Sequence, residues 1–222
     1  MDDQQMAFER VLRLLDSAGC LEHVILIGSW VEFVYRESGL LKGFNPIIRT
    51  LDIDILVRNL RRPNPPANLV TVARDAGYLV QSDRLDGSTR LLDMSGLEVE
   101  FLICKVGAGV EETLKTHIGV TAQAMRHLDI LSSHTVRVIC LGYSLIVPTP
   151  EAYSVHKMVI NSKRGLKAEK DAATVLGLYP SLDSDKFSMV LGSLIKKERS
   201  AALSFLQRYG LTLPGNSNRL GE

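Results

Sequence analysis

The sequence predicts an α/β fold for the N-terminal part of the chain and an all-helical segment after it. Short apolar, β-branched runs alternate with segments of helical periodicity, a pattern typical of strands and helices that share one core. Beyond Pro148-Thr149-Pro150 only helical periodicity remains. Asp52 and Asp54 lie one residue apart in a strand-like run, so both side chains point to the same face. We therefore expect two domains, residues 1–147 and residues 148–222.

Apolar spacing and breaker residues place the elements of the first domain. In chain order they are a helix over 6–19, a strand over 23–27, a helix after Gly28-Ser29, a loop over 39–46, a strand over 51–57, a surface connection over 58–66, a helix over 68–76, strands over 78–80 and 89–92 joined by an Asp86-Gly87 turn, a strand over 97–103, and strands over 134–141 and 145–147. The second domain is expected to contain helices over 150–164, 168–178 and 184–209, with a frayed tail after Pro214.

Composition indicates a globular protein with a substantial core. Of the 222 residues, 45% are hydrophobic and 23% are charged, so disorder is not expected. The formal net charge is +1, which gives no global attraction for nucleic acid. The three cysteines are far apart and lack Cys-x-x-Cys spacing, so neither a disulfide framework nor a zinc site is indicated.

The amino terminus is acidic and polar, where a signal peptide would be basic and then apolar. The chain has no uninterrupted apolar run of about 18 residues, the length expected of a membrane span. We therefore expect a cytoplasmic protein without a membrane partner.

The carboxylates of Asp52 and Asp54 suggest a metal site. Ionised carboxylates beside buried aliphatic side chains are costly unless a cation neutralises them, and oxygen ligands suit magnesium. Asp183 and Asp185 show the same spacing at an expected helix start, so the apolar setting of the first pair is the distinguishing feature. The alternative is a strand edge with one acidic side facing solvent.

Gly28 and Ser29 follow a strand-like run and precede a helix. This position can present backbone N–H groups and a hydroxyl to a phosphate at a helix N-terminus. The order Gly-Ser, spacer, Asp-x-Asp resembles the nucleotidyltransferase superfamily that includes the polymerase-beta-like enzymes. With Arg49 ahead of the aspartates, the motif looks closer to the bacterial group of AbiEii-type toxins and related nucleotidyltransferases.

This resemblance implies a core with a twisted mixed sheet flanked by helices, and a helical domain that closes over it. It also implies transfer of a nucleoside monophosphate from a nucleoside triphosphate, such as ATP, to a hydroxyl, with release of pyrophosphate. Asp52 and Asp54 would hold two magnesium (or manganese) ions, and Gly28 and Ser29 would bind the β- and γ-phosphates.

The superfamily calls for a third carboxylate on a later strand. Glu98 and Glu100 alternate with apolar residues in the expected strand 97–103 and share one face. The family pattern of an acid before a short apolar run favours Glu100 as the catalytic, metal-sharing acid. Glu98 is the alternative, and a plain surface strand is the third possibility.

A second block lies in the helical region. Lys157 and Arg164, followed by the pair Lys170-Asp171, are similar to a block of the AbiEii-like group, so we assign Lys157, Arg164 and Asp171 to nucleotide binding. The competing interpretation is a solvated basic helix face.

The acceptor is not identified by any residue, and RNA, protein and small molecules all stay open. The AbiEii resemblance raises a toxin role with an antitoxin partner. The rival hypothesis is a non-catalytic nucleotide-binding or partner-binding module on the same fold.

Overall fold

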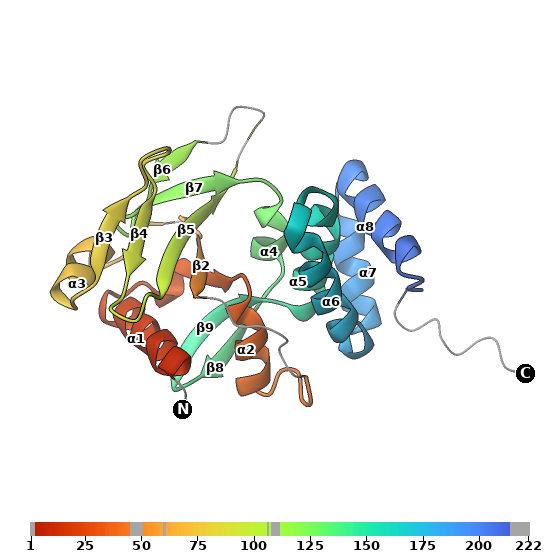
Figure 1. Ribbon diagram of the computed structural model, residues 1–222, viewed down its shortest axis with the longest axis horizontal. Helices are drawn as coiled ribbons and strands as arrows, with labels where there is room; N and C mark the ends of the chain where they lie inside the picture. Colours follow the sequence, from red (N-terminus) through yellow and green to blue (C-terminus); the bar gives the residue numbers. More distant parts are fainter. Residues whose placement is uncertain (1–2, 45–50, 60, 106, 108–111, 214–222) are drawn as a thin grey trace, which may run out of the picture.

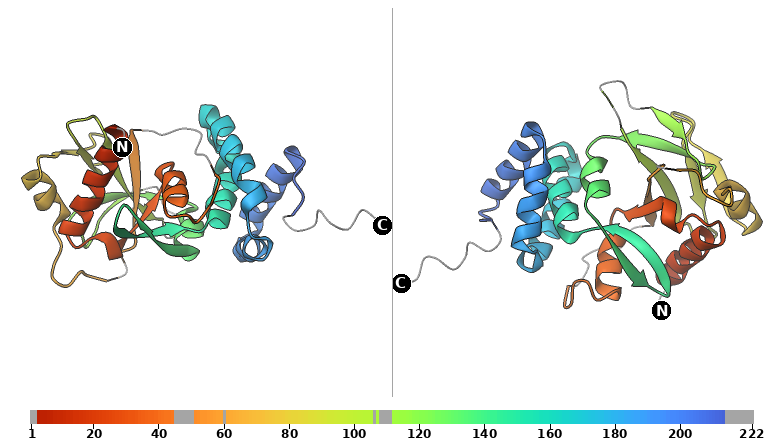
Figure 2. Two further views of the ribbon diagram at one scale, coloured as in Figure 1. Left: turned by 90° about the horizontal axis from the view of Figure 1, so that it is seen from below. Right: turned by 180° about the vertical axis from the view of Figure 1, so that it is seen from behind.

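The computed structural model describes residues 3–44, 51–59, 61–105, 107 and 112–213. It confirms the mixed α/β fold, with a sheet flanked by helices and a group of helices after it (Figure 1). The two views of Figure 2 show the β-rich part and the helical part side by side along the long axis of the molecule. The expected loop over 39–46 lies partly, and the expected tail after Pro214 wholly, outside the described residues, as does Arg49.

The strands are β1 (Val24–Ile27), β2 (Asp52–Val57), β3 (Leu79–Ser82), β4 (Thr89–Leu92), β5 (Glu98–Cys104), β6 (Thr113–Lys115), β7 (Thr121–Met125), β8 (Thr135–Cys140) and β9 (Tyr143–Pro148). The α-helices are α1 (Asp3–Ser17), α2 (Trp30–Glu37), α3 (Leu69–Asp75), α4 (Leu128–Ser133), α5 (Pro150–Ile160), α6 (Ala168–Leu178), α7 (Ser184–Ser193) and α8 (Lys196–Arg208).

The main sheet is mixed. Its strand order is β1-β2-β5-β4-β3, and β7 pairs with β5 and carries β6 at its other edge. The central pair β2 and β5 is parallel, whereas β1 runs antiparallel to β2 and β4 antiparallel to β5. The hairpin of β8 and β9 forms a separate two-stranded sheet that packs against β1.

One face of the sheet is apolar. Ile53 and Ile55 of β2, with Val99 of β5, are completely or almost completely buried in the main core. Helix α1 belongs to the same core, where Phe8 stacks on Trp30 of α2 with ring centroids 4.5 Å apart. The alternation of apolar and acidic residues in β2 and β5 thus buries one set of side chains and turns the other set to the opposite face.

The opposite face of the sheet has an apolar part at one end of the strands and an acidic part at the other. At the carboxyl ends of β2 and β5, Leu56 and Leu102 join a small apolar cluster with Leu128 and Leu131 of α4. At the amino ends the same face carries the acidic residues, which α4 does not cover. The fold therefore leaves the acidic end of the two central strands accessible.

The helical part differs from expectation at two places. The predicted helix over 150–164 ends at Ile160 and continues as short 3-10 turns, so Arg164 lies beyond α5. The predicted helix over 184–209 is two helices, because Leu194 and Ile195 adopt extended backbone between α7 and α8. The Arg199 side chain donates to the carbonyls of Leu191 and Gly192, which stabilises the end of α7.

Sequence periodicity also missed β6, β7 and α4. Strands β6 and β7 are short and rich in polar residues, so they lack an alternating apolar signal. Helix α4 has only six residues, and its N-cap, His127, is in the left-handed region with φ 67°.

The main apolar core extends from α1 to α8, with Phe8 and Phe205 in one cluster of buried residues. The Tyr35 hydroxyl of α2 donates to the carbonyl of Pro148, at the expected domain boundary, over 2.7 Å. Because this core and this hydrogen bond cross the expected domain boundary, the division of the chain at 147/148 stays a prediction. None of the described helices has the length and apolar character that a membrane span requires.

Candidate active site

The parallel pairing of β2 and β5 brings the predicted carboxylates together. In the register Asp52 lies beside Glu98, and Asp54 beside Glu100. Direct neighbours on adjacent strands share a face, so all four carboxylates project from the open face of the sheet. Asp52 is exposed and the other three are partly buried.

Gly28 lies directly against this acidic group. It has φ 71°, and a Cβ atom there would come within 2.0 Å of the Asp54 Oδ2 atom. Ile27, the last residue of β1, is the register partner of Asp54, which explains the close approach. A glycine is therefore required both by the backbone conformation and by the Asp54 carboxylate. The junction of β1 and α2, where Ser29 precedes the first helical residue, thus adjoins the acidic end of the sheet.

Arg90 of β4, which sequence reasoning did not identify, holds the two glutamates. Its guanidinium contacts Glu98 at 2.8 Å, Glu100 at 3.3 Å and Asp83 at 3.2 Å. Glu100 has the longer contact with Arg90 of the two glutamates and is the register partner of Asp54, so it is the better placed to turn toward Asp54. The signal in the sequence was a lone arginine in the strand-like run Thr89–Leu92.

The carboxylates affect one another electrostatically. Burial, together with repulsion from Asp52, raises the pKa of Asp54, although Lys167, Arg164 and Lys157 oppose the rise. Burial also raises the pKa of Glu100, against the effect of Arg90, and its acidic neighbours add to the rise. Burial is the main cause of both shifts and the acidic neighbours add to it, so a bound cation would lower both pKa values.

The donor set fits a divalent cation in part. Asp52 and Asp54 supply the oxygen ligands that magnesium and manganese prefer. In the described parts of the chain, however, no three His, Cys, Asp or Glu side chains are arranged to hold a metal ion. To complete such a set, Glu100 would have to leave its contact with Arg90 and turn toward Asp52 and Asp54.

The structure brings together the three residues assigned in the helical region. Lys157 Nζ lies 2.7 Å from Asp171 Oδ1, and Arg164 Nε lies 2.8 Å from Asp171 Oδ2. Burial alone would raise the pKa of Asp171, but these two cations lower it below its ordinary value. Since Asp171 is buried and bound to both cations, its position is that of an anchor for Lys157 and Arg164.

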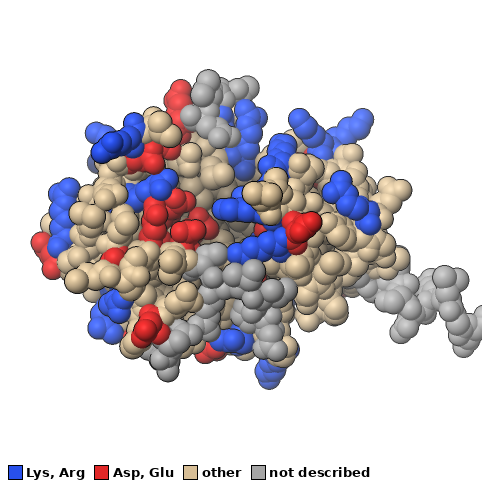
Figure 3. Space-filling model, viewed as in Figure 1, with Lys and Arg blue, Asp and Glu red and all other residues tan. Residues whose placement is uncertain are grey.

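Lys157 and Arg164 lie near enough to the acidic end of the sheet for their charges to oppose the rise in the pKa of Asp54. Figure 3 shows acidic side chains gathered in the middle of the visible face, with Lys and Arg side chains of the helical part beside them. An arrangement of this kind can accommodate a bound polyphosphate on its cationic side and a metal ion on its acidic side.

A buried polar network links α2 to the helices that carry the cations. Glu32 accepts hydrogen bonds from the Tyr153 hydroxyl at 2.8 Å and from the Thr174 hydroxyl at 3.3 Å. Lys157 Nζ lies 4.9 Å from the centroid of the Tyr153 ring. Burial raises the pKa of Glu32, while Lys157 and the two hydrogen bonds oppose the rise. The sequence signal was a glutamate within the apolar run of α2.

The comparisons with known proteins concern the family and the fold of the chain. A family model described as nucleotidyltransferase matches residues 7–187. No curated protein is significantly similar in sequence.

Two solved structures share the fold. An antigenic nucleotidyltransferase-like protein from Paracoccidioides brasiliensis has a TM-score of 0.55 and 14% identity, over 94% of this chain and 89% of that chain. The antibiotic-resistance factor ANT(2'')-Ia has a TM-score of 0.50 and 13% identity, over 95% of each chain. At these identities the likeness concerns the fold alone.

Proposed function

The chain belongs to a nucleotidyltransferase family, and we propose that it moves a nucleoside monophosphate from a nucleoside triphosphate to an acceptor hydroxyl with release of pyrophosphate. The observation that carries this proposal is the parallel register of β2 and β5. It sets Asp52 and Asp54 beside Glu98 and Glu100, opposite the cations held by Asp171.

The proposed roles follow from position. Gly28 and Ser29 would take the β- and γ-phosphates at the start of α2, and Lys157 and Arg164 would neutralise charge on the leaving pyrophosphate. Magnesium or manganese held by Asp52 and Asp54 would neutralise the triphosphate and lower the pKa of the acceptor hydroxyl. Glu100 would accept the proton of that hydroxyl, and its raised pKa suits a proton acceptor.

The first experiment measures nucleotide and metal binding by calorimetry. Wild-type protein is titrated with a non-hydrolysable triphosphate in the presence and absence of magnesium. We expect magnesium-dependent binding that is lost in the double variant Asp52→Ala plus Asp54→Ala, because the metal ligands are gone. An unchanged magnesium-dependent heat of binding in that variant would contradict the proposed metal site.

The second experiment uses the two glutamates as a matched pair. Glu100→Gln is expected to lower nucleotidyl transfer by at least about a hundredfold with nucleotide affinity retained within about tenfold, because only proton transfer is removed. Glu98→Gln keeps a hydrogen-bond acceptor for Arg90 and is expected to retain most activity. Exchanged phenotypes would identify Glu98 as the third acid.

A non-catalytic module is the second candidate. It is favoured by the contact of Glu100 with Arg90 and by the lack of a three-residue metal group among the described residues. Triphosphate binding without transfer to any acceptor would support it. A toxin role with an antitoxin partner is a narrower proposal that rests on the AbiEii-like motif at Asp52 and Asp54. Growth arrest on expression, relieved by Asp54→Ala, tests that role.

A further inference from the structure

A hollow beside the acidic group has no role in the functions described above. It has a volume of about 560 Å³ and is lined by residues of β3, the β3–β4 turn, β4 and β5, among them Gln81, Asp83, Arg90 and Glu98. Two of these also belong to the candidate active site, since Glu98 is one of its carboxylates and Arg90 contacts both Glu98 and Glu100. The hollow and that site are therefore continuous.

The strand order places this hollow on one side of the carboxylates. Strand β1, which leads to Gly28 and the start of α2, borders β2, whereas β4 and β3 lie beyond β5. The attacking and leaving oxygens of a phosphoryl transfer lie roughly in line. With pyrophosphate toward Gly28 and the cations, the attacking hydroxyl approaches from the β4 and β3 side, where the hollow lies.

The charges around the hollow disfavour an anionic occupant. Arg90 is shared by three carboxylates, those of Asp83, Glu98 and Glu100. The lining itself holds two carboxylates, those of Asp83 and Glu98, and two arginines, Arg84 and Arg90. Glu100, Asp52 and Asp54 add three carboxylates on the adjoining strand face, so carboxylates outnumber arginines around the hollow. The phosphates of an RNA end would be repelled, while a neutral or cationic compound would not.

The size and lining indicate a small molecule. The volume lies in the range of roughly 300–1,000 Å³ found for small-molecule sites. Gln81, Ser82 and Arg90 offer hydrogen-bond donors, and Leu92 offers an apolar surface. The hollow is partly open to solvent beside the β3–β4 turn, so a compact acceptor can enter it directly.

We propose that this hollow is the acceptor site and that the acceptor is a non-anionic, hydroxyl-bearing small molecule. The inference rests on the proposed nucleotidyl transfer. The acceptor oxygen forms a bond to the α-phosphorus, and the bond from that phosphorus to the oxygen bridging the β-phosphate breaks. Pyrophosphate leaves with the electron pair, and the hydroxyl proton passes to the Glu100 carboxylate.

Two experiments test this proposal. The first separates the classes of acceptor, and the second fills the hollow with a larger side chain. Wild-type protein, magnesium and each α-labelled nucleoside triphosphate are incubated with the dialysable small molecules, the total RNA or the total protein of a cell extract. We expect label in the small-molecule fraction, in a product whose acceptor part is neutral or cationic on ion exchange. Label in RNA or protein would overturn the acceptor class.

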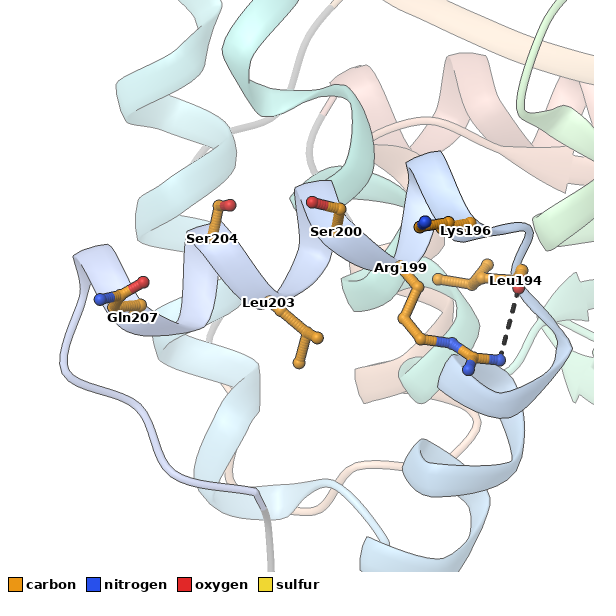
Figure 4. A pocket seen from close by; sticks show the side chains of 7 residues that line it. All are labelled: Leu194, Lys196, Arg199, Ser200, Leu203, Ser204 and Gln207. Carbon is orange, nitrogen blue, oxygen red and sulfur yellow. Dashed lines mark hydrogen bonds between the residues drawn. The ribbon is translucent and has the colours of Figure 1, made fainter.

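Gln81→Trp tests the location, because Gln81 is exposed, lines the hollow and pairs with Arg90 in the register. We expect transfer to fall by about tenfold or more while triphosphate affinity stays within about twofold. The matched control is Ser204→Trp in a second hollow of about 420 Å³ along α8 (Figure 4). That helix lies at the far side of the helical part from β3, so transfer should be unchanged (Figure 1).

The outcomes distinguish this inference from the proposed function. Equal transfer by Gln81→Trp and wild-type protein would overturn the assignment of the hollow and leave nucleotidyl transfer intact. Triphosphate binding with label in none of the three fractions would overturn nucleotidyl transfer, and this inference with it, in favour of the non-catalytic module. No binding of triphosphate by wild-type protein would instead contradict the proposed function itself.

Discussion

At Asp54, burial and the charge of a neighbouring carboxylate act in the same direction. Its carboxylate packs against the Cα of Gly28, neighbours Asp52 on the same strand face and lies beside Glu100. A buried anion with anionic neighbours destabilises the folded state unless a cation is bound. The same property makes it suitable as a metal ligand.

The raised pKa of Asp54 gives a prediction about stability. When the folded-state pKa of an acid is raised, the folded state binds more protons than the unfolded state between the two values, so stability falls as pH rises through that window. At neutral pH and without metal, Asp54→Asn is therefore expected to raise Tm, by about 2–4 °C for each kcal/mol regained.

Thermal unfolding of metal-free protein at neutral pH measures this effect. Asp52→Asn is the matched comparison, because it removes the repulsion from Asp52 and leaves the burial of Asp54 unchanged, so its gain in Tm should be the smaller one. The advantage of Asp54→Asn should shrink as the pH is lowered. A lower Tm for Asp54→Asn than for wild-type protein at neutral pH would contradict the argument.

At Gly28 the structure gives a different reason for glycine from the one that the sequence suggests. The sequence suggests that a side chain there would block a phosphate, whereas the structure shows that it would first meet Asp54. Gly28→Val should therefore disturb the fold as well as the site. A selective loss of triphosphate binding is not the expected result.

Among the elements, α5 links the cationic side of the site to α2 and α6. Its Tyr153 reaches Glu32 on α2, and its Lys157 reaches Asp171 on α6. The ring of Tyr153 also lies under the Lys157 ammonium group. Through these contacts α5 fixes the cations relative to the start of α2.

Tyr153→Phe tests this positioning role. It keeps the aromatic ring but removes the hydrogen bond to the buried Glu32, which should cost about 1–3 kcal/mol of stability. We also expect triphosphate affinity to fall by about threefold to tenfold, because α2 and α5 are no longer tied together. Calorimetric titration of the folded variant measures the loss.

Tyr35→Phe is the matched control for that variant. Tyr35 is equally buried, its ring packs edge-on against Tyr153, and its hydroxyl donates to Pro148. It should lower stability to a similar extent without lowering triphosphate affinity. Equal losses of affinity in both variants would indicate a purely structural role for Tyr153.

At the scale of the whole molecule, one apolar core joins the β-rich part to the helical part. Residues from α1 to α8 belong to one cluster, and Tyr35, Glu32 and Thr174 add polar links across it. A shared core favours unfolding as one cooperative unit rather than as two domains.

We therefore predict a single thermal transition in which the calorimetric and van't Hoff enthalpies agree. The fragment 1–147 should lack fixed tertiary structure, because Glu32 and Tyr35 would lose their partners. Differential scanning calorimetry and near-ultraviolet circular dichroism measure these properties. Two resolved transitions, or a natively folded fragment, would show that the parts are independent domains.

The local pattern of apolar and polar residues was sufficient to predict many of the strands and helices. The alternation of acidic and apolar residues identified β2 and β5 and the face that carries their carboxylates, because side-chain direction in a strand depends only on position. Periodicity likewise identified α1, α5 and α6. It joined α7 to α8, since the break depends on Arg199 reaching the carbonyls of α7.

The sequence by itself determined the α/β class and the nucleotidyltransferase superfamily, and it indicated the acidic and basic residues of the candidate site. Only the tertiary structure decided how they meet: the parallel pairing that sets Asp54 beside Glu100, the hold of Arg90 on both glutamates, and the burial of Asp171 between two cations. Strand register and long-range ion pairs join residues far apart in the chain. No local preference encodes such contacts, because they arise when the whole core packs.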